Sequence, residues 1–563
     1  MDDVDAVQAE IARNMLESGD WVTARLDGVA YLEKAPLIYW AMALSYQVFG
    51  VHDWTARLPV ALSAIALCWI TTSFGVWAFS ERAGFYSGLV LSTCIGLFLF
   101  TRIQIPDVTL TATVGLALWS FLRAIDDQEQ HPRWWAFLLA ASLGVGLLLK
   151  SLIGVLFPVA AGLIYLVLTR QFLSWKIWRR LRPFSGCWIV LAIAAPWHVL
   201  AALRNPPVFD LTLHSVAGAY HGFLWFFFIN EQLLRFLNLR FPRDYNTVPR
   251  LYFWLLHLLW LFPWSVYLPA IVSKVSVRPS DRAEKTRLLA LCWIGFVLIF
   301  FTFSTTQEYY SMPCYPAFAL LLGAAMDRRG GWIKRGNRAL ACIAALAAFA
   351  AFALAFLVRN QPAPGDISTA LDTHSSDYTL ALDHLQDLTL QSFAYLRLPL
   401  LLAGVAFLIG AVGSFWKKAA RTYLPAALMM VVFFHAARLA LVVFDPYLSS
   451  RPIAETLLSS PPGQLIVDHH YYTYSSVFFY TNRTALLLNG RIDNLVYGSS
   501  APGAPPVFIG DPQFQLLWLK DQRYYLVADQ SARARLQHLV GDARFRLLLA
   551  SGGKMLLTNL PVP

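Results

Sequence analysis

Charged residues are scarce in this 563-residue sequence, in which Asp, Glu, Lys and Arg together make up 14%. Ordinary soluble domains contain about 25% of these residues. Hydrophobic residues make up 57%, and the mean hydropathy is +0.51. This composition excludes a protein that is dissolved in water over most of its length.

Cysteines are also few, and they have neither paired spacing nor the spacing of metal ligands. All six lie in or at the edge of apolar runs: Cys68, Cys94, Cys187, Cys292, Cys314 and Cys342. This pattern argues against a disulfide framework and indicates packing residues. The sequence offers no ligand set for zinc.

Long apolar runs dominate the sequence instead. About twelve of them lie between residues 55 and 443, and each is long enough to cross a hydrocarbon core of about 30 Å as a helix. They are 55–79, 83–100, 107–126, 134–149, 151–170, 184–202, 252–274, 286–303, 313–326, 337–358, 396–414 and 422–443. We therefore predict an α-helical polytopic membrane protein whose transmembrane bundle occupies residues 55–443.

The net charge of +11 is unevenly distributed. Lys and Arg gather in four short loops between the predicted spans, at 170–182, 274–287, 327–338 and 416–421. This is the pattern of the positive-inside rule, so we interpret the charge as topology and predict no nucleic-acid partner. Alternation of the spans then places the loop 203–250 and everything after residue 443 outside the cytoplasm.

Both ends of the chain differ from the bundle. Residues 1–54 begin with an amphipathic stripe of Val7, Ile11, Met15 and Leu16, which predicts helices lying in the membrane interface. An outer start needs a preceding span, so we expect a further helix upstream. Residues 444–563 contain six short strand-like runs and a helical pattern at 530–540, which predicts a small soluble α/β domain on the outer face.

The first sixty residues carry a dense set of motifs after an acidic cluster. They include A-E-I-A-R-N-M, E-S-G-D-W, L-D-G, Y-L-E-K-A-P-L-I-Y-W and F-G-V-H-D-W-T-A-R-L-P. This order resembles the bacterial protein-mannosyltransferase-like and aminoarabinose-transferase-like family. The resemblance implies a GT-C fold of about twelve to thirteen transmembrane helices. It also implies transfer of a sugar from a polyprenyl-phosphate donor to a lipid, glycan or protein acceptor outside the cytoplasm. The location that it implies is a bacterial inner membrane, with the site and the C-terminal domain facing the periplasm.

The resemblance implies roles for residues near the start of the chain. Lys34 matches the lysine that contacts the donor phosphate, with Glu33 beside it as a substrate-binding residue. The acidic cluster matches imperfectly: Asp3 or Asp2 takes the first catalytic role and Asp5 the second, and we predict Asp3 with Asp5. Alternatively, these acids cap the following helix, where negative charge is favourable.

Two further charges stand at the ends of predicted spans. Asp107 is the first residue of a predicted span. It either caps that helix or, as the resemblance implies, acts as a catalytic acid near the acceptor. Lys150 lies between two spans in L-L-L-K-S-L-I-G, where burial is costly unless the side chain reaches the interface or an anion. We predict that Lys150 binds the donor phosphate.

The outer loops contain the remaining candidates. Asn230, Glu231 and Arg235 lie about one helical turn apart, either as a solvated ion pair or as a substrate-binding face. Arg235 and Arg240 are predicted to bind phosphate, because guanidinium groups make bidentate contacts with phosphate oxygens. Glu308 and Tyr309 are predicted to contact the sugar.

We therefore predict an inverting glycosyltransferase, and the resemblance implies that it needs neither a metal nor a cofactor. Lys34, Lys150 and Arg235 would stabilise the departing phosphate, while Asp3 or Asp107 would position or deprotonate the acceptor. The alternatives are a transporter or flippase of lipid-linked saccharides and a non-catalytic scaffold. Transporters favour internal repeats and charges at mid-span, and neither is found here.

Overall fold

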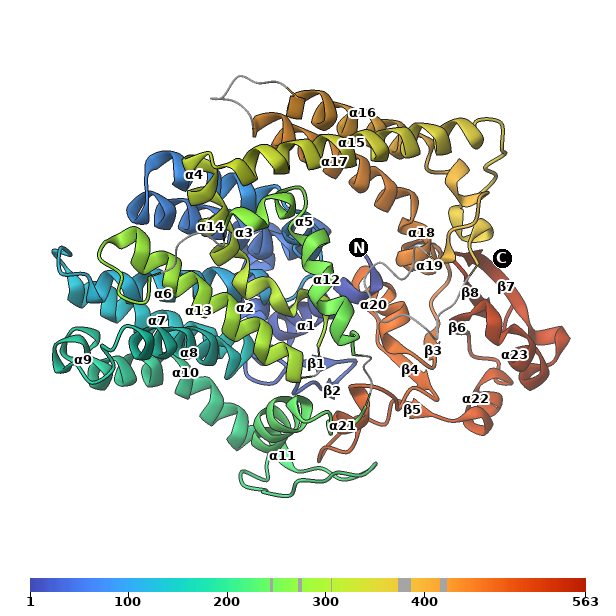
Figure 1. Cartoon of the computed structure of the whole chain (residues 1–563). Coiled ribbons are helices and arrows are strands. Elements are labelled where there is room, and N and C mark those ends of the chain that lie inside the picture. Colours follow the sequence, from blue (N-terminus) through green and yellow to red (C-terminus); the bar gives the residue numbers. More distant parts are fainter. Residues whose placement is uncertain (244–246, 272–275, 305, 373–385, 416–422, 563) are drawn as a thin grey trace.

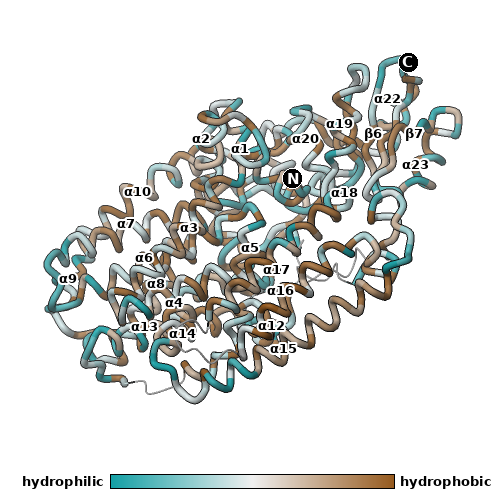
Figure 2. Tube along the Cα trace, turned by 90° about the horizontal axis from the view of Figure 1, so that it is seen from above, coloured by the Kyte–Doolittle hydropathy of each residue, from teal (hydrophilic) through white to brown (hydrophobic). Residues whose placement is uncertain are grey.

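The computed structural model describes residues 1–243, 247–271, 276–304, 306–372, 386–415 and 423–562. A helical bundle makes up most of the molecule, and a smaller domain with a β-sheet lies at one end of it (Figure 1). Apolar residues are concentrated in the bundle helices, whereas hydrophilic residues gather at their ends and in the smaller domain (Figure 2).

Where the residues are described, each predicted span coincides with helical structure. The bundle consists of α3 (Asp53–Ala78), α4 (Glu81–Ser92), α5 (Ile95–Phe100), α6 (Asp107–Ile125), α7 (Pro132–Lys150), α8 (Ile153–Leu168), α9 (Trp175–Leu181), α10 (Pro183–Arg204), α12 (Arg250–Trp260), η2 (Trp264–Ala270), α13 (Arg282–Phe303), α14 (Tyr315–Arg328), α15 (Gly331–Leu357), α16 (Arg397–Phe415) and α17 (Leu424–Val443). The predicted basic loop 416–421 lies outside the described residues.

The number of single straight spans is smaller than predicted. Among the described residues, eight helices are long and apolar enough to cross a membrane, or nine if α12 and η2 count as one. Those two are bent by 104°, and Pro263, between them, cannot donate a backbone hydrogen bond. The predicted span 83–100 is divided after Ser92, where the Thr93 hydroxyl bonds to the Leu89 carbonyl and accepts from the Trp264 indole.

Helix α6 lies at the centre of the bundle and packs against α3, α7 and α8. The turn from α7 into α8 is held close by two glycines: a Cβ at Gly154 would lie 2.4 Å from the carbonyl carbon of Gly146. Only hydrogen at that position lets the two backbones touch. This contact fixes the end of α7, where Lys150 lies.

The first fifty residues form a layer between the bundle and the C-terminal domain. It contains α1 (Asp3–Ser18), the short strands β1 (Arg25–Leu26) and β2 (Val29–Ala30), and α2 (Leu37–Phe49). The predicted stripe of α1 is buried at Val7, Ile11 and Met15. Asp3, Asp5 and Glu10 are buried as well, because α1 packs against both α2 and α20 (Ser475–Thr481), whereas Glu17 is exposed.

Each of the six strand-like runs contains a strand. These are β3 (Gln464–Asp468), β4 (Ala485–Leu488), β5 (Phe508–Ile509), β6 (Tyr524–Asp529), β7 (Arg546–Ser551) and β8 (Lys554–Thr558), in the order β5-β4-β3-β6-β8-β7. The first four strands of this order are parallel to one another, and β8 pairs antiparallel with both of its neighbours, β6 and β7. The helices are α18 (Asp445–Leu448), α19 (Arg451–Ser459), α20, α21 (Leu495–Ser499), α22 (Asp511–Trp518) and α23 (Arg533–Val540).

Three connecting segments complete the fold around the outer end of the bundle. The loop 203–250 contains α11 (Gly222–Leu224) and a π-helix, η1 (Trp225–Leu234). A 3-10 helix, η3 (Glu308–Cys314), joins α13 to α14 and packs against α6. Shorter 3-10 turns are η4 (Ile367–Ala370), η6 (Ser392–Ala394), η7 (Tyr471–Tyr474), η8 (Gln530–Ala532) and η9 (Asp542–Arg544).

Candidate functional site

A cavity of about 360 Å³ lies where α6 begins and α7 ends, beside η1, η3 and the Glu33 turn. One part of its wall is polar: Glu33, Lys34, Asp107, Lys150, Glu231, Arg235, Tyr309 and Tyr310. The other part is apolar and includes Leu152, Leu156, Phe228, Phe236 and Phe300. The cavity therefore has a charged end and an apolar part.

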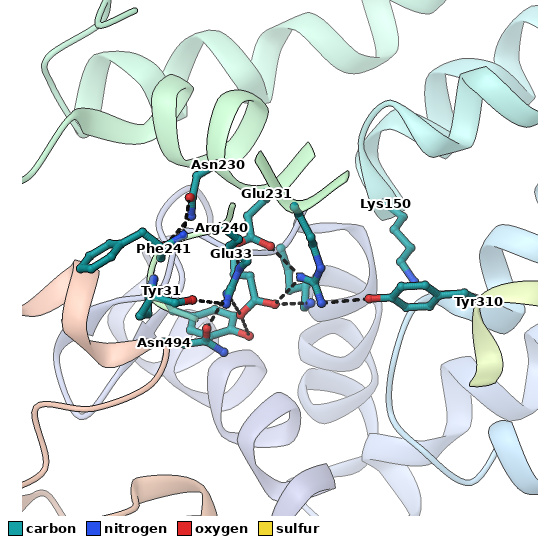
Figure 3. Close-up of polar contacts among 12 residues, drawn as sticks. Tyr31, Glu33, Lys150, Asn230, Glu231, Arg240, Phe241, Tyr310 and Asn494 are labelled. Carbon is teal, nitrogen blue, oxygen red and sulfur yellow. Dashed lines mark hydrogen bonds and ion pairs between the residues drawn. The ribbon is translucent and has the colours of Figure 1, made fainter. Parts of the chain in front are cut away.

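Glu33 is the centre of the charged end (Figure 3). Its carboxylate accepts a hydrogen bond from Lys34 and one from the Tyr31 hydroxyl at 3.0 Å. Arg235 and Arg240 approach it at 3.8 and 3.7 Å. Burial alone would raise the pKa of Glu33, but Lys34 and the two arginines outweigh burial and lower it to about 2. Glu33 is therefore a fixed negative charge.

Lys34 and Arg235 keep their positive charges in this setting. Burial acts to lower the pKa of Lys34, but the carboxylates of Glu33 and Glu231 raise it above its usual value. Burial likewise disfavours charge on Arg235, yet the surrounding acids and tyrosines raise its pKa. Both cations line the cavity and are available to an anion.

The π-helix η1 places two predicted residues in different roles. Glu231 accepts from Arg235 at 2.8 Å and from Arg240. Asn230 instead binds the backbone of Phe241 through both amide atoms, at 2.6 and 2.9 Å. Asn230 thus holds the segment that carries Arg240, and π-helical turns are often found at functional sites.

Lys150 approaches the cavity from the opposite wall. Its ammonium lies 2.5 Å from Asp107 and stacks over the rings of Tyr310, at 4.7 Å, and Tyr309, at 5.3 Å. The Tyr310 hydroxyl accepts from Arg235 at 2.9 Å, so it connects the two walls. Lys34, Arg235 and Lys150 therefore surround one space from three different segments of the chain.

Other predicted residues lie away from the cavity lining. Asp3 is buried under the C-terminal domain, where it accepts from Lys554 at 2.5 Å, Ser450 at 3.0 Å and the Ser476 amide at 2.8 Å. Asp5 accepts from Arg57 at 2.6 Å and from the Gln104 amide at 2.9 Å.

Arg240 and Glu308 are buried beside the cavity rather than in its wall. The catalytic roles of Asp3 and Asp5 stay predictions, and their positions give those roles no support.

Three residues of the network were not predicted from the sequence: Tyr31, Tyr310 and Asn494. Tyr31 opens the motif Y-L-E-K-A-P-L-I-Y-W and Tyr310 follows the predicted Tyr309, so their positions could have suggested them. Asn494 comes from the C-terminal domain, and its side-chain oxygen accepts from Arg240 at 2.7 Å. No pattern in the sequence indicates this contact.

Comparison with known proteins gives a consistent result. Residues 33–199 match the sequence model of the dolichyl-phosphate-mannose-protein mannosyltransferase family. The chain is similar to undecaprenyl phosphate-alpha-4-amino-4-deoxy-L-arabinose arabinosyl transferases. It is 27% identical to that of Aeromonas hydrophila over 56% of this chain and 54% of the relative. It is 24% identical to that of Erwinia tasmaniensis over 92% and 86%.

The chain spans about half the length of the first of these relatives. Among solved structures, ArnT from Cupriavidus metallidurans bound to undecaprenyl phosphate superimposes with a TM-score of 0.79 at 23% identity, over 99% of this chain and 93% of ArnT. These findings confirm the predicted resemblance and the predicted fold class, though not the number of helices.

Proposed function

Because residues 33–199 carry the mannosyltransferase-family domain and the whole chain has the fold of an aminoarabinose transferase, we propose that this protein is an integral-membrane glycosyltransferase. It moves a sugar from undecaprenyl phosphate to an acceptor on the periplasmic side of the inner membrane. The sugar of the similar proteins, 4-amino-4-deoxy-L-arabinose, is the first donor to test, and lipid A is the first acceptor.

The two-sided cavity is the observation that carries this proposal. Its apolar wall suits an isoprenoid chain, and its three cations, Lys34, Lys150 and Arg235, suit the phosphate at the end of that chain. A soluble sugar nucleotide would have no use for the apolar part. A polyprenyl phosphate needs both parts together.

The proposed reaction is a single displacement. An acceptor oxygen attacks the anomeric carbon, the bond between that carbon and the phosphate oxygen breaks, and undecaprenyl phosphate leaves with the negative charge. One displacement inverts the anomeric centre. The three cations are held by Glu33, Glu231 and Asp107 before the substrate arrives, so they stabilise the departing phosphate at little cost of reorganisation.

Asp107 is the proposed partner of the acceptor. Of the three acids that line the cavity, Glu33 and Glu231 contact arginines, whereas Asp107 contacts Lys150 alone among the charged residues of the described chain. A carboxylate in this position takes the proton of an acceptor hydroxyl or orients it. Fixed cations supply the charge that a metal ion supplies in other transferases, so we propose a metal-independent reaction.

The proposed orientation follows from the ends of α7. Lys150 lies at the cavity, and Pro132, at the other end, adjoins the basic segment 170–182. The positive-inside rule places that basic segment in the cytoplasm, so the cavity faces the periplasm.

Release of undecaprenyl phosphate from the labelled donor tests the proposal. Membranes containing the chain are compared with Lys34→Met and with Lys520→Met, an exposed lysine of the C-terminal domain that serves as the matched control. We expect Lys34→Met to lower release about 100-fold or more and Lys520→Met to leave it unchanged. If no donor is consumed while labelled lipid crosses the bilayer, the protein is a flippase and the proposal fails.

A further inference from the structure

A second cavity, of about 410 Å³, lies at the other end of the bundle. Five basic residues line it: Arg133, Lys176, Arg179, Arg180 and Arg182. Helix α7 runs from Pro132 at this cavity to Lys150 at the candidate site, which separates the two by about 27 Å along the helix. Since this distance is close to the thickness of the hydrocarbon core, the second cavity lies at the opposite membrane interface.

The positive charges of this cavity are only partly neutralised. Lys176 and Arg180 share one acid, Asp127, at 2.8 and 3.0 Å. In the part of the chain that the structure describes, the side chains of Arg133, Arg179 and Arg182 have no hydrogen-bond or ion-pair partner. Three unpaired guanidinium groups around one hollow repel each other, so an anion that they share would stabilise them.

Large apolar side chains surround the same cavity. Trp175, which lines it, is 75% exposed. Trp134 follows Arg133, and Phe184 follows the start of α10; both are also exposed. Aromatic rings at this depth contact lipid near the headgroups. The surface therefore offers a cationic hollow beside exposed apolar groups, which complements a molecule with an anionic head and acyl chains.

Helix α9, which carries four of the cavity's residues including Trp175, lies at the end of the molecule away from the C-terminal domain in both views (Figures 1 and 2). It is seven residues long, with Ile177 buried and Lys176 and Arg179 exposed. Together with α10 it forms one stretch of 30 residues, Trp175–Arg204, which at about 45 Å is longer than the hydrocarbon core, so α9 extends beyond the core. Its position between α8 and α10 keeps it at the headgroup level.

We propose that this cavity binds the phosphate headgroup of an anionic phospholipid in the leaflet opposite the candidate site. Arg133, Arg179 and Arg182 contact the phosphate, and the acyl chains lie along Trp134 and Phe184. Guanidinium groups suit this task because they bind phosphate through two parallel hydrogen bonds. Basic pockets at the ends of transmembrane helices bind anionic headgroups in the same way. The site is separate from the proposed sugar transfer and does not depend on it.

Quenching of tryptophan fluorescence by brominated lipids tests the proposal on the full-length chain in phosphatidylcholine nanodiscs. Brominated phosphatidylglycerol is titrated against brominated phosphatidylcholine, and Trp175→Phe isolates the signal of Trp175 from the other tryptophans. We expect a component that is quenched selectively by phosphatidylglycerol in the wild type and that is absent from Trp175→Phe.

Two triple variants separate a binding site from general attraction. The first is Arg133→Gln with Arg179→Gln and Arg182→Gln. The second, Lys334→Gln with Arg335→Gln and Arg338→Gln, removes the same charge from exposed positions near the start of α15. We expect the first to weaken selective quenching about tenfold or more and the second by less than about threefold.

Three outcomes would overturn the proposal. Equal weakening by the two triple variants would assign the attraction to overall charge. Equal quenching by both lipids in the wild type would show that the cavity does not select anionic headgroups. Displacement by inorganic phosphate over the concentration range of the lipid would make it a site for free phosphate. Unchanged elution and unfolding temperature of both triple variants show that they are folded.

Discussion

Two clusters of buried ionisable residues lie near the outer end of the bundle, and they differ in which partner faces open space. At the junction with the C-terminal domain, Asp3 and Lys554 are equally enclosed, with side chains 6% and 7% exposed. Around the cavity the acids are as buried, but Lys34 is 26% exposed and Lys150 and Arg235 are 19% exposed. Buried acids there orient cations toward the cavity.

A buried ion pair alone therefore does not indicate a binding site. Removing one partner of a buried pair is costly wherever the pair lies, so burial reports on stability. A cation that is held by a buried acid and still faces a cavity is in addition available to an anion. Arg240 shows the distinction within one network, because it contacts the same Glu231 as Arg235 but is only 1% exposed.

The largest expected effect concerns the open cluster. Lys150→Met should lower release of undecaprenyl phosphate about 100-fold or more, because the departing phosphate loses a cation. It should also lower the unfolding temperature, since Asp107 is left buried without its partner.

Addition of Asp107→Asn tests the effect on stability. The double variant should recover the unfolding temperature, because no unpaired buried charge remains. It should stay inactive, because it lacks both the cation for the departing phosphate and the proposed partner of the acceptor. Recovery of activity together with stability would mean that neither Lys150 nor Asp107 takes part in the reaction.

The closed cluster should behave in the opposite way. Lys554→Met leaves Asp3 buried without its cation and should reduce the free energy of unfolding by about 3–5 kcal/mol. Adding Asp3→Asn should restore most of this stability, and sugar transfer by the double variant should stay within about threefold of the wild type. The measurements are thermal unfolding and donor release on the same preparations.

Asp3→Asn alone decides between two roles for this acid. Full loss of transfer in a variant that unfolds at the wild-type temperature would support the catalytic role predicted from the sequence. An enclosed ion pair, Asp3 with Lys554, would then take part in the reaction, and exposure to the cavity would no longer distinguish functional residues from structural ones.

A third effect concerns an acid that is buried without a cation contact. Glu10 lies on the same helix as Asp3, and in the described residues its Oε2 has no hydrogen-bond partner. Burial raises its pKa to about 7. A folded-state pKa above the unfolded value means that Glu10 stabilises the fold below about pH 4.5 and that this contribution is lost as the pH rises to about 7.

Glu10→Gln should therefore flatten the fall in stability between these pH values, by about 1–3 kcal/mol. The unfolding temperature at pH 5 and pH 8 measures the change. Glu17→Gln, at an exposed position of the same helix, is the control and should leave the pH dependence as it is. An unchanged slope in Glu10→Gln would show that Glu10 is ionised in the folded protein.

The fold could be predicted from the sequence where buried segments appear as continuous apolar runs. Apolar runs marked the helical segments of the bundle except α9, which lies in the predicted basic loop 170–182. Strands β3 and β6 are continuous hydrophobic strands because parallel strands are covered on both faces. The bend between α12 and η2 was missed, because mean hydropathy does not register a break within an apolar run.

The site could be predicted only where its residues lie in motifs. Lys34, Lys150, Glu231 and Arg235 were identified from local patterns, and the structure brings them to one cavity. The environment of Asp3 could not be predicted, because Lys554 lies 551 residues away in the sequence and belongs to another part of the fold. Contacts between distant segments leave no mark on either segment alone.

The smallest expected effect tests whether the C-terminal domain takes part in the open cluster. The C-terminal domain contacts Arg240 through the side-chain oxygen of Asn494, which accepts a hydrogen bond from Arg240 at 2.7 Å. Arg240 also donates hydrogen bonds to Glu231 and to the Pro242 carbonyl. Asn494→Ala should lower kcat/KM about threefold to tenfold, because one hydrogen bond to a charged group is lost while the others remain. Asn494→Asp keeps an acceptor and should restore the rate. Equal rates in all three proteins would confine the C-terminal domain to the closed cluster, where its contribution is the stability given by Lys554 rather than the position of Arg240.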